Sequence, residues 1–440
     1  MGKYLHEIRD PVHVFIRLDT DEREVLDSRP LQRLRHIHQL GLTYLLYPGA
    51  THRRFEHSLG VMELATRIFD VITDQSSIRS DVRDIMPSGD QKTYWRRVLR
   101  MAALCHDLGH LPFSHSADHR LFPKGWSHER MTAEIIRSQE MEGVWKKITP
   151  PLRSEDIAKI AIGPREGQKV GLKRFDLWET ILSEIIVGDT FGADRMDYLL
   201  RDSLHAGVAY GKFDHYRLVD TLRILPKSGR EEDSNEPTLG LLEGGLHSAE
   251  ALLWARYFMY SQVYYHQVRR IYDIHLGDFL EKKMGTNKVP TESNDFLGLD
   301  DNQVLVWIRE SVWNQKDQVN ELAKRIFERR HFKRIYERNP EDQEINTQAS
   351  EVIYKAACKK FGEDSVRYDE CKQEGGSKLF PVQIKDGRVL QSIELSTTLQ
   401  KVPGVFTEYV FVEDKCRNEA EAWLGAKRLE ILESRKETEE

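Results

Sequence analysis

Histidine is concentrated in one part of this 440-residue sequence, where seven of the 17 histidines fall between residues 52 and 128. Imidazole is a common ligand of transition metals and the side chain that exchanges protons near neutral pH. A random spread over the surface does not explain this density, so it points to one site. The seven are His52, His57, His106, His110, His115, His119 and His128.

The adjacent pair His106-Asp107 forms the centre of this cluster, at the end of an expected helix over residues 95–107. Imidazole suits iron, manganese, nickel or zinc, whereas a carboxylate accepts harder cations and can bridge two metals. The apolar turn 101–104 would bury the end of the helix and limit the access of water. A His-Asp pair alone is a weak signal, because neighbouring residues on a helix point about 100° apart.

The motifs around the pair resemble those of HD-domain phosphohydrolases. His57 lies in Arg-Arg-Phe-Glu-His-Ser-Leu-Gly-Val, and Asp194 lies in Ala-Asp-Arg-Met-Asp-Tyr. The resemblance is closer to the dNTP triphosphohydrolase branch that includes the vertebrate enzyme with SAM and HD domains. It covers about residues 6–280, and we expect no SAM domain ahead of the HD region. Further shared stretches are Gln-Arg-Leu-Arg (32–35), Gln-Leu-Gly (39–41), Pro-Gly-Ala (48–50) and Gly-His with Pro-Phe-Ser-His (109–115).

By position, the resemblance implies four metal ligands: His57, His106, Asp107 and Asp194. Two imidazoles and two carboxylates leave open positions on a six-coordinate metal for water and for a phosphate oxygen. We therefore expect a divalent metal cofactor, with Fe, Mn, Mg, Ni and Zn all compatible. For Asp194 the alternative is a helix cap or a salt bridge.

A second group of residues would act on the phosphates and on the leaving group. His110 follows His106 by four residues and lies on the same side if the helix continues. His115 and Asp118 are spaced to hydrogen-bond, which would orient the imidazole and raise its basicity. In similar enzymes the residue at His115 protonates the leaving ester oxygen, and those at His110 and His128 hold phosphate. The alternative is that these are ordinary polar loop residues.

A third group would bind the nucleotide. A triphosphate needs several cations, which arginine supplies in planar, bidentate geometry. By resemblance, Gln39 hydrogen-bonds the 3′-hydroxyl of the sugar, and Leu40 leaves no room for a 2′-hydroxyl, which would select deoxyribose. For the two tyrosines of this group the alternative is core packing. The other members are Arg54, Arg195, Arg256, Tyr198, Tyr264 and Asp202.

Three positions depart from the pattern of the vertebrate enzyme. Arg195 keeps a charge where that enzyme has lysine, but changes its geometry. Tyr260 and Tyr265 replace a histidine and a glutamine near the base, which leaves the base preference open. We assign structural roles to His52 and His119.

Similar enzymes are activated by a nucleotide at a second site that lies between subunits. Asp27, Gln32 and Arg35 match the residues that read the base there, whereas Arg9 replaces an asparagine. The resemblance therefore implies a nucleotide activator and a homo-oligomer, either a dimer or a tetramer. For Gln32 and Arg35 the alternative is an ordinary charged helix face.

Together these residues favour hydrolysis of dNTP substrates to deoxynucleoside and tripolyphosphate. One alternative is an HD phosphohydrolase acting on monophosphates, cyclic nucleotides or another phosphoester, because the metal ligands do not discriminate among these. Another is a non-catalytic nucleotide sensor or single-strand nucleic-acid binder. A sensor that has lost activity usually lacks a ligand, and none is missing from this sequence.

The composition of the chain indicates which class of protein and which compartment to expect. The net charge is −6, and hydrophobic and charged residues make up 40% and 31%, as in globular proteins. We see no run of the roughly 18 apolar residues that a membrane span needs, and no signal-peptide core at the N-terminus. We therefore expect a cytoplasmic protein without membrane association. The basic stretch 324–334 makes nucleic-acid contact an alternative that we do not favour.

Helical periodicity dominates the first 280 residues, which predicts a mainly α fold. We expect a helical HD-domain bundle over residues 1–280 and a smaller α+β region, 281–440, for assembly or regulation. The helices are expected over 22–26, 31–39, 55–72, 95–107, 131–137, 179–205 (with breaks at Gly188 and Gly192) and 245–276.

The last 160 residues show a different pattern. Apolar alternation around Lys-Asp-Gly predicts a β-hairpin over residues 379–395, and residues 406–412 form a further strand candidate. Helices are expected over 304–332 and 416–432, with a charged linker over 337–344.

Overall fold

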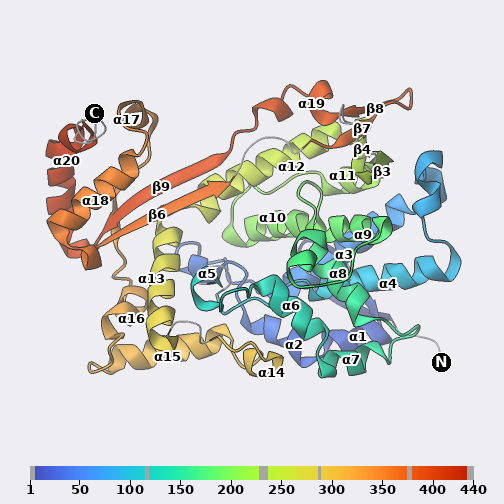
Figure 1. The fold of residues 1–440 in the computed structure, drawn as a ribbon, viewed down its shortest axis with the longest axis horizontal. Helices are drawn as coiled ribbons and strands as arrows, with labels where there is room; N and C mark the ends of the chain where they lie inside the picture. Colours follow the sequence, from blue (N-terminus) through green and yellow to red (C-terminus); the bar gives the residue numbers. More distant parts are fainter. Residues whose placement is uncertain (1–4, 114–117, 227–235, 286–288, 374–378, 434–440) are drawn as a thin grey trace. The chain divides into compact units, whose positions relative to one another are not determined.

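Figure 1 shows the computed structural model of the chain, in which helices dominate and the β-sheets are small. The structure describes residues 5–113, 118–226, 236–285, 289–373 and 379–433. Two compact units interleave along the sequence: residues 1–259, 286–304 and 376–402, and residues 260–285, 305–375 and 403–440. The predicted mainly α fold with a smaller α+β C-terminal region is confirmed. The domain division at residue 280 stays a prediction.

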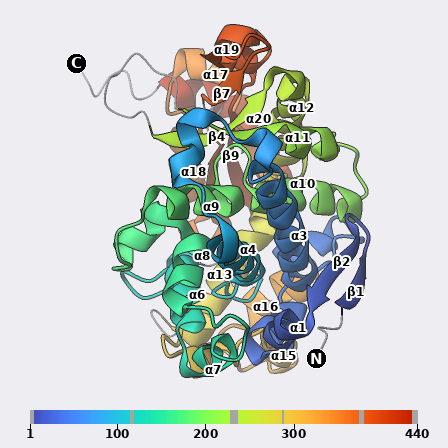
Figure 2. The same cartoon turned by 90° about the vertical axis from the view of Figure 1, so that its right-hand side faces the viewer.

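The first unit begins with an antiparallel hairpin that we did not predict, formed by β1 (Leu5–Asp10) and β2 (Val14–Asp19). Ile16 and Leu18 of β2 are buried, and the other residues of the strand are exposed or half-buried, as in a strand that covers a core with one face. Figure 2 shows this hairpin beside α3. Helix α1 (Thr20–Leu26) follows directly, and the Asp19 side chain caps it by accepting the amide of Glu22.

Helix α3 (Arg54–Ile72) is the central element of the first unit and packs against α4 (Gly89–Cys105) and α10 (Ala193–Ala206). The expected helix over residues 55–72 is therefore confirmed. Buried residues lie all around α3, which is typical of a helix inside a core. The expected break in the 179–205 helix is also confirmed, since α9 (Leu177–Val187) ends before Gly188 and α10 begins after Gly192.

Shorter helices complete the first unit. They are α2 (Arg29–Arg33), α5 (Asp118–Leu121), α6 (His128–Ile136), α7 (Gln139–Trp145), α8 (Ser154–Lys169), α11 (His215–Thr221), α12 (Leu246–Met259), α14 (Ser293–Phe296) and α19 (Ser392–Leu395). Helix α15 (Asp301–Trp313) begins in this unit and continues into the second.

Two expected helices are wrong in part. The helix over residues 31–39 ends at Arg33; a 3-10 turn follows, and His38 then pairs with Arg53 in a β-bridge. The helix over 245–276 is interrupted by a π-helical turn, Tyr260–Tyr264, before α13 (Gln267–Met284). In both cases local apolar periodicity continues through the break, so tertiary contacts decide where the helix ends.

A small sheet of the first unit has the strand order β3-β4-β7-β8. Its strands are β3 (Leu222–Pro226), β4 (Pro237–Leu242), β7 (Pro381–Gln383) and β8 (Val389–Gln391). The predicted hairpin around Lys-Asp-Gly is confirmed by the antiparallel pairing of β7 with β8. It is shorter than expected, because α19 begins at Ser392.

The second unit is built on an antiparallel sheet in the order β5-β9-β6. Alternate residues of β9 face different neighbours, as the period of two of a strand requires. Val410 and Val412 belong to the cluster formed with α18 and α20, whereas Tyr409 and Phe411 pack with Ile271 of α13. The elements are β5 (Lys333–Glu337), β6 (Val366–Gln373), β9 (Val405–Val412), α16 (Asn320–Phe327), α17 (Pro340–Ile345), α18 (Ala349–Phe361) and α20 (Arg417–Glu433).

The strand candidate at residues 406–412 is therefore confirmed, but the charged linker over 337–344 is wrong. Its residues form the end of β5 and most of α17, where Asn339 accepts the amide of Asp342 and Pro340 occupies the first helical position. The expected helix over 304–332 is likewise divided into α15 and α16.

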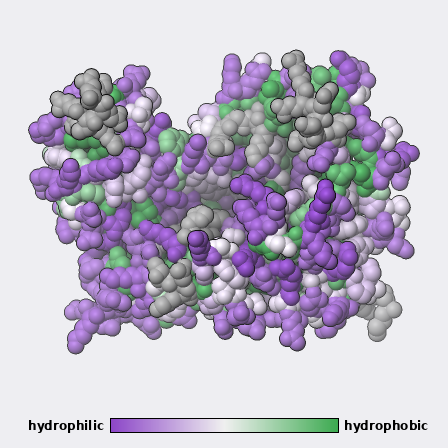
Figure 3. Space-filling model, viewed as in Figure 1, coloured by the Kyte–Doolittle hydropathy of each residue, from purple (hydrophilic) through white to green (hydrophobic). Residues whose placement is uncertain are grey.

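Hydrophilic side chains cover most of the face drawn in Figure 3. Among the residues that the structure describes, we find no helix with the length and apolar character needed to cross a membrane.

Candidate active site

His57 lies in the first turn of α3 and is buried inside the first unit. The helix starts at Arg54, and the Glu56 carboxylate accepts the amide of Arg53, which fixes the first turn. His57 is fully buried, and its two ring nitrogens meet carboxylates on α10: Nδ1 lies 2.8 Å from Asp197 and Nε2 lies 3.0 Å from Asp194. Burial would lower the pKa of His57, but the bonds to these carboxylates outweigh it and raise the pKa to about 10.

His106 and Asp107 follow the last residue of α4, where a run of buried side chains anchors the helix end. Nδ1 of His106 donates to the Ala103 carbonyl over 2.8 Å, and a carbonyl can only accept, so Nδ1 carries the proton. Nε2 faces Oδ1 of Asp107, 3.3 Å away, and Oδ1 of Asp194, 3.6 Å away. Burial would lower the pKa of His106, but these two carboxylates outweigh it and raise the pKa. Among the described residues, no hydrogen-bond donor satisfies the buried Nε2.

A cation fits this arrangement better than any group already there. His57, His106 and Asp107 offer ligand atoms that all lie within 4.8 Å of one another. Asp194 adds a second carboxylate, because its Oδ1 faces Nε2 of both histidines. Imidazoles among carboxylates bind either protons or, when deprotonated, a divalent metal, which neutralises the two carboxylates more fully than the protons do. The structure thus brings the four residues expected as ligands to one place.

Asp197 connects His57 to a buried polar network. Its carboxylate accepts hydrogen bonds from His57, from Nε2 of His13 at 2.7 Å and from Arg201. Arg201 also pairs with Asp10 of β1 at 2.8 Å. Gly60 makes room for this network, because a Cβ atom there would come within 1.9 Å of Asp197. The network fixes the orientation of the His57 ring, as carboxylates behind ligand histidines do.

The residues expected to hold phosphate also lie beside the cluster of expected metal ligands. His110 lies 3.2 Å from Oδ1 of Asp107 and stacks on the His128 ring with 4.2 Å between centroids. The Arg54 guanidinium pairs with the other Asp107 oxygen. Burial would raise the pKa of Asp107, but Arg54, His106 and His110 hold it well below its usual range. Gly109 permits this packing, since a Cβ atom there would lie 2.0 Å from the His128 carbonyl oxygen.

The catalytic pair expected at His115 and Asp118 cannot be located in the same way. His115 lies outside the described residues, and so does the side chain of Asp118, although α5 begins at that residue. Phe113, just before this stretch, is fully buried.

The predicted nucleotide-binding residues lie in several elements. Leu40 is buried, and Gln39 is half-buried next to it. Asp202 accepts a hydrogen bond from Nε2 of His52 at 2.7 Å, and the His52 ring stacks on His205 at 4.4 Å. No pattern in the sequence predicted the His52–Asp202 contact. Arg195, Tyr198 and Arg256 are half-buried in the first unit, and Tyr264 is buried in the π-helical turn of the second.

The three residues predicted to read an activator base fall into two groups, and in the described part of the chain no hydrogen bond or ion pair joins the two. Arg35 donates to the Gln32 side chain over 2.9 Å and lies over the Phe55 ring, 3.5 Å from its centroid. Asp27 pairs with Arg23 at 2.7 Å and lines an open surface groove of about 560 Å³.

Comparison with known proteins agrees with this geometry. The HD domain family matches residues 54–167, which contain three of the four residues expected as ligands. A second family, described as the HD associated region, matches residues 213–361.

Three curated relatives align with most of the chain. MJ1154 of Methanocaldococcus jannaschii is 35% identical, covering 74% of this chain and 59% of its own. YwfO of Bacillus subtilis is 30% identical, covering 78% and 75%. The deoxynucleoside triphosphate triphosphohydrolase SAMHD1 of Bos taurus is 29% identical, covering 79% and 61%. The chain thus spans less than two thirds of the length of MJ1154 and of the bovine enzyme.

The fold also matches a solved structure over nearly its whole length. A hypothetical protein from Aquifex aeolicus superposes with a TM-score of 0.76 at 33% identity, covering 96% of this chain and all of its own.

Proposed function

The chain belongs to the HD-domain family of metal-dependent phosphohydrolases, and we propose that its substrates are deoxynucleoside triphosphates. In the proposed reaction, water attacks the α-phosphorus, the bond from phosphorus to the 5′-oxygen breaks, and the products are deoxynucleoside and tripolyphosphate. The observation that carries the hydrolase assignment is the buried, unsatisfied Nε2 of His106 facing two carboxylates and Nε2 of His57.

The residues of the cluster would hold a divalent metal through two imidazoles and two carboxylates. When bound, such a metal neutralises phosphate charge and lowers the pKa of water. His57, His106, Asp107 and Asp194 would supply the ligand atoms. Asp197 keeps the His57 ring in the orientation that presents Nε2, through the hydrogen bond to Nδ1.

Phosphate would be held beside this cluster. Arg54 is buried and already pairs with a carboxylate, so an incoming phosphate oxygen would meet a positioned guanidinium. Burial and the charges of Arg54 and His128 hold the pKa of His110 well below its usual value. His110 is therefore neutral and can donate one hydrogen bond without the desolvation cost of an imidazolium. We propose that His110 and His128 contact the phosphates together.

The leaving 5′-oxygen requires a proton. We propose that His115 donates it and that Asp118 orients His115, as the sequence resemblance implies. The proton then ends on the 5′-hydroxyl of the deoxynucleoside, and the hydroxyl from water ends on the tripolyphosphate.

Discrimination between dNTPs and other phosphoesters would come from the residues outside the cluster. We propose that Gln39 and Leu40 select the deoxyribose, with Tyr198, Asp202 and Tyr264 near the sugar and base and Arg195 and Arg256 near the phosphates. Support comes from the similarity to the bovine dNTP triphosphohydrolase over 79% of this chain. A site that crowds a 2′-hydroxyl can reject the ribonucleotide strongly.

We further propose a homo-oligomer activated by a nucleotide at Asp27, Gln32 and Arg35, and a cytoplasmic location. Arg35 donates a hydrogen bond to Gln32, which supports a shared role for these two side chains. Both lie a few residues before Gln39 in the chain.

The test is a product assay with the purified protein. It is incubated with Mg²⁺ or Mn²⁺ and each dNTP, alone and with GTP or dGTP, and the products are separated. Tripolyphosphate and deoxynucleoside are expected. Orthophosphate from monophosphates, or cleavage of cyclic nucleotides without tripolyphosphate, would instead support a different HD phosphohydrolase. Bound metal without turnover of any of these would support a nucleotide or nucleic-acid binder.

A further inference from the structure

Asp301 joins two segments that lie far apart in the sequence. It is the first residue of α15 and its side chain is buried, with 1% of the residue exposed. Oδ2 accepts the backbone amide of His38 at 2.7 Å and Nδ1 of the His38 ring at 2.6 Å. Oδ1 accepts the backbone amide of Phe113 at 2.6 Å. One carboxylate therefore fixes the main chain at two loops.

Each of these loops leads directly into residues of the proposed reaction. His38 immediately precedes Gln39 and Leu40, which are proposed to recognise the sugar. Phe113 lies six residues after Asp107, in the segment that follows α4 and contains His110. The rings of His38 and Phe113 also stack, with 5.7 Å between centroids and 9° between planes. The sugar side and the phosphate side of the site therefore meet at Asp301.

The backbone at Phe113 depends on this contact. Its φ of 57° lies in the left-handed region, which a bulky residue rarely adopts. Such a conformation persists only where the surroundings fix it. At Phe113 they do so through full burial, the stacked His38 ring and the charged acceptor Asp301.

A second anchor lies two residues before Asp301. The buried Arg33 donates to the carbonyl of Leu299 at 2.7 Å. The same guanidinium donates to the carbonyls of Leu108 and His110 at 3.3 and 2.9 Å, in the same segment as Phe113. Arg33 and Asp301 thus connect this segment to the start of α15 at more than one point.

We propose that Asp301 is a positioning residue that sets the sugar-recognising segment against the phosphate-binding loop, and thereby contributes to the preference for deoxyribose. The inference rests on the proposed function. Among the described residues, Asp301 makes no hydrogen bond to the four expected metal ligands, so its effect on turnover is separable from metal binding.

The test compares Asp301→Ala and Asp301→Asn with Asp300→Asn. Asp300 is a matched control, because it caps the same helix by accepting the amide of Gln303 at 2.9 Å and asparagine preserves that cap. Asp301→Asn keeps one acceptor oxygen and replaces the other with an amide donor, so it retains one of the two backbone anchors.

Three measurements are made: kcat and KM for dATP and ATP, bound metal, and amide hydrogen exchange over residues 38–40 and 108–113. Asp301→Ala should lower kcat/KM for dATP by about 10²-fold, as a displacement of about 1 Å does. It should also lower the ratio of dATP to ATP turnover. Exchange should accelerate in both segments while bound metal stays unchanged. Asp301→Asn should fall between Asp301→Ala and wild type, and Asp300→Asn should match wild type.

Some outcomes would overturn the proposal. Equal losses for dATP and ATP, or loss of metal in parallel with activity, would assign Asp301 to stability alone. Unchanged amide exchange at His38 and Phe113 in Asp301→Ala would mean that Asp301 does not fix these two segments. If the wild-type protein does not hydrolyse dNTPs, the proposed function fails by itself, and the specificity role of Asp301 fails with it. The exchange data then still decide whether Asp301 positions the two loops.

Discussion

Both units of the chain bury histidine side chains, but His57 of the first unit and His275 of the second lie among opposite charges. In the first unit, carboxylates hold His57 from both ring nitrogens, and the pKa rises to about 10. In the second, burial together with Arg325 and Arg367 keeps the pKa of His275 well below its usual value. Nε2 of His275 accepts the amide of Phe332 at 3.1 Å.

The difference separates a candidate metal centre from a structural histidine. A ring of carboxylates stabilises a positive charge, either the imidazolium of His57 or a divalent cation that takes the place of its Nε2 proton. Arginines around a neutral imidazole repel a cation, and the ring serves as a hydrogen-bond acceptor inside a core. Burial alone is common to both histidines, so the charge of the neighbours decides their chemistry.

The largest effect is expected from removing two of the candidate metal ligands in the first unit. His106→Ala combined with Asp107→Ala should abolish metal binding and lower turnover by roughly 10³-fold or more, as loss of several kcal/mol of charge stabilisation implies. Helical content should stay the same, because α4 ends before both residues. Metal analysis, circular dichroism and the product assay check this. Continued dNTP hydrolysis by the variant would show that the site is elsewhere.

Asp197→Asn should weaken the centre without removing a proposed ligand. The hydrogen bond to Nδ1 of His57 orients the ring, and loss of such a partner typically lowers metal affinity by about 10–100-fold. Asp202→Asn is the matched control, since Asp202 also lies on α10 and binds a histidine, His52, at 2.7 Å. Metal titration of both variants should show a change for Asp197→Asn alone. Equal metal affinities of the two variants would mean that the hydrogen bond between Asp197 and His57 does not support metal binding.

A third prediction concerns the second unit and pH. The folded-state pKa of His275 lies below the unfolded value of about 6.5, so the unfolded chain binds the proton more readily. Stability should therefore fall as the pH drops below about 6.5, with this residue contributing up to about 1.4 kcal/mol per pH unit.

His275→Asn isolates this contribution, because asparagine keeps an acceptor for the Phe332 amide and does not titrate. Urea unfolding between pH 5 and 8 should give a shallower acid dependence for the variant than for wild type. If stability depended on pH equally in the variant and the wild type, His275 would be protonated in the folded protein, and it would then not differ from His57 in charge.

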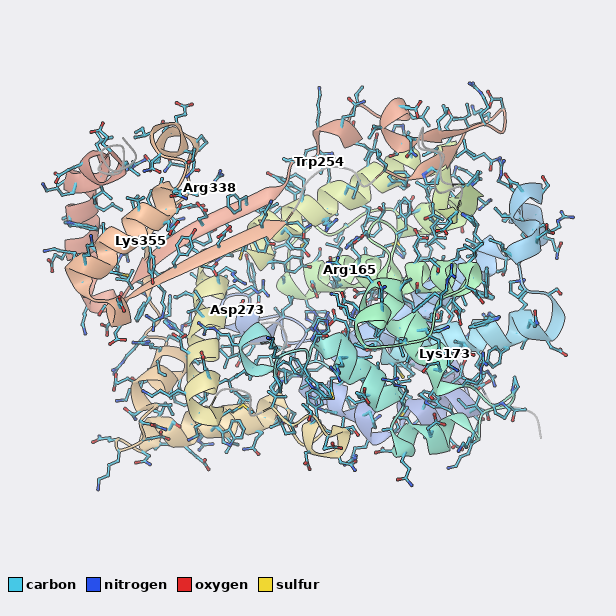
Figure 4. All side chains as sticks on the ribbon, in the orientation of Figure 1. Arg165, Lys173, Trp254, Asp273, Arg338 and Lys355 are labelled. Atoms are coloured by element: carbon cyan, nitrogen blue, oxygen red, sulfur yellow. The ribbon has the colours of Figure 1, made fainter. Side chains whose placement is uncertain are left out.

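The smallest effect is expected at an exposed ion pair. Lys355, labelled in Figure 4, pairs with Glu351 one turn earlier on α18, and more than half of its side chain is exposed to solvent. Lys355→Ala should change the free energy of unfolding by at most about 0.5 kcal/mol, because solvent screens such pairs. A larger loss in thermal or urea unfolding would mean that charge matters to the second unit outside its core as well.

The helical elements were the most predictable part of the fold. The apolar stripe of residues 55–72 predicted α3, and the glycines at 188 and 192 predicted the break between α9 and α10. Hairpin β1–β2 and strands β3, β4, β5 and β6 were missed, because most are short and β6, although eight residues long, lacks a regular alternation of apolar residues. The π-helical turn was missed for the opposite reason, since its residues continue the helical pattern.

The candidate site was only partly predictable. His57, Asp194 and the His106-Asp107 pair are visible through motifs, but the contacts that support them are not. Asp197 and Arg33 lie within such motifs, yet the partners of these residues and of Asp301 are far away in the chain. His13 and Asp197 lie 184 positions apart, and His38 and Asp301 lie 263 apart. No local pattern marks Asp301 as different from other charged residues.

The amino-acid sequence determined which side chains are available for metal and phosphate chemistry, and which segments form amphipathic helices. The tertiary structure decided which carboxylate faces which imidazole, why His57 and His275 differ, and where Asp301 holds two loops together. Side-chain type and periodicity are properties of neighbouring residues along the chain. Burial, electrostatic attraction and hydrogen bonding depend on distance in space, which only the folded chain sets.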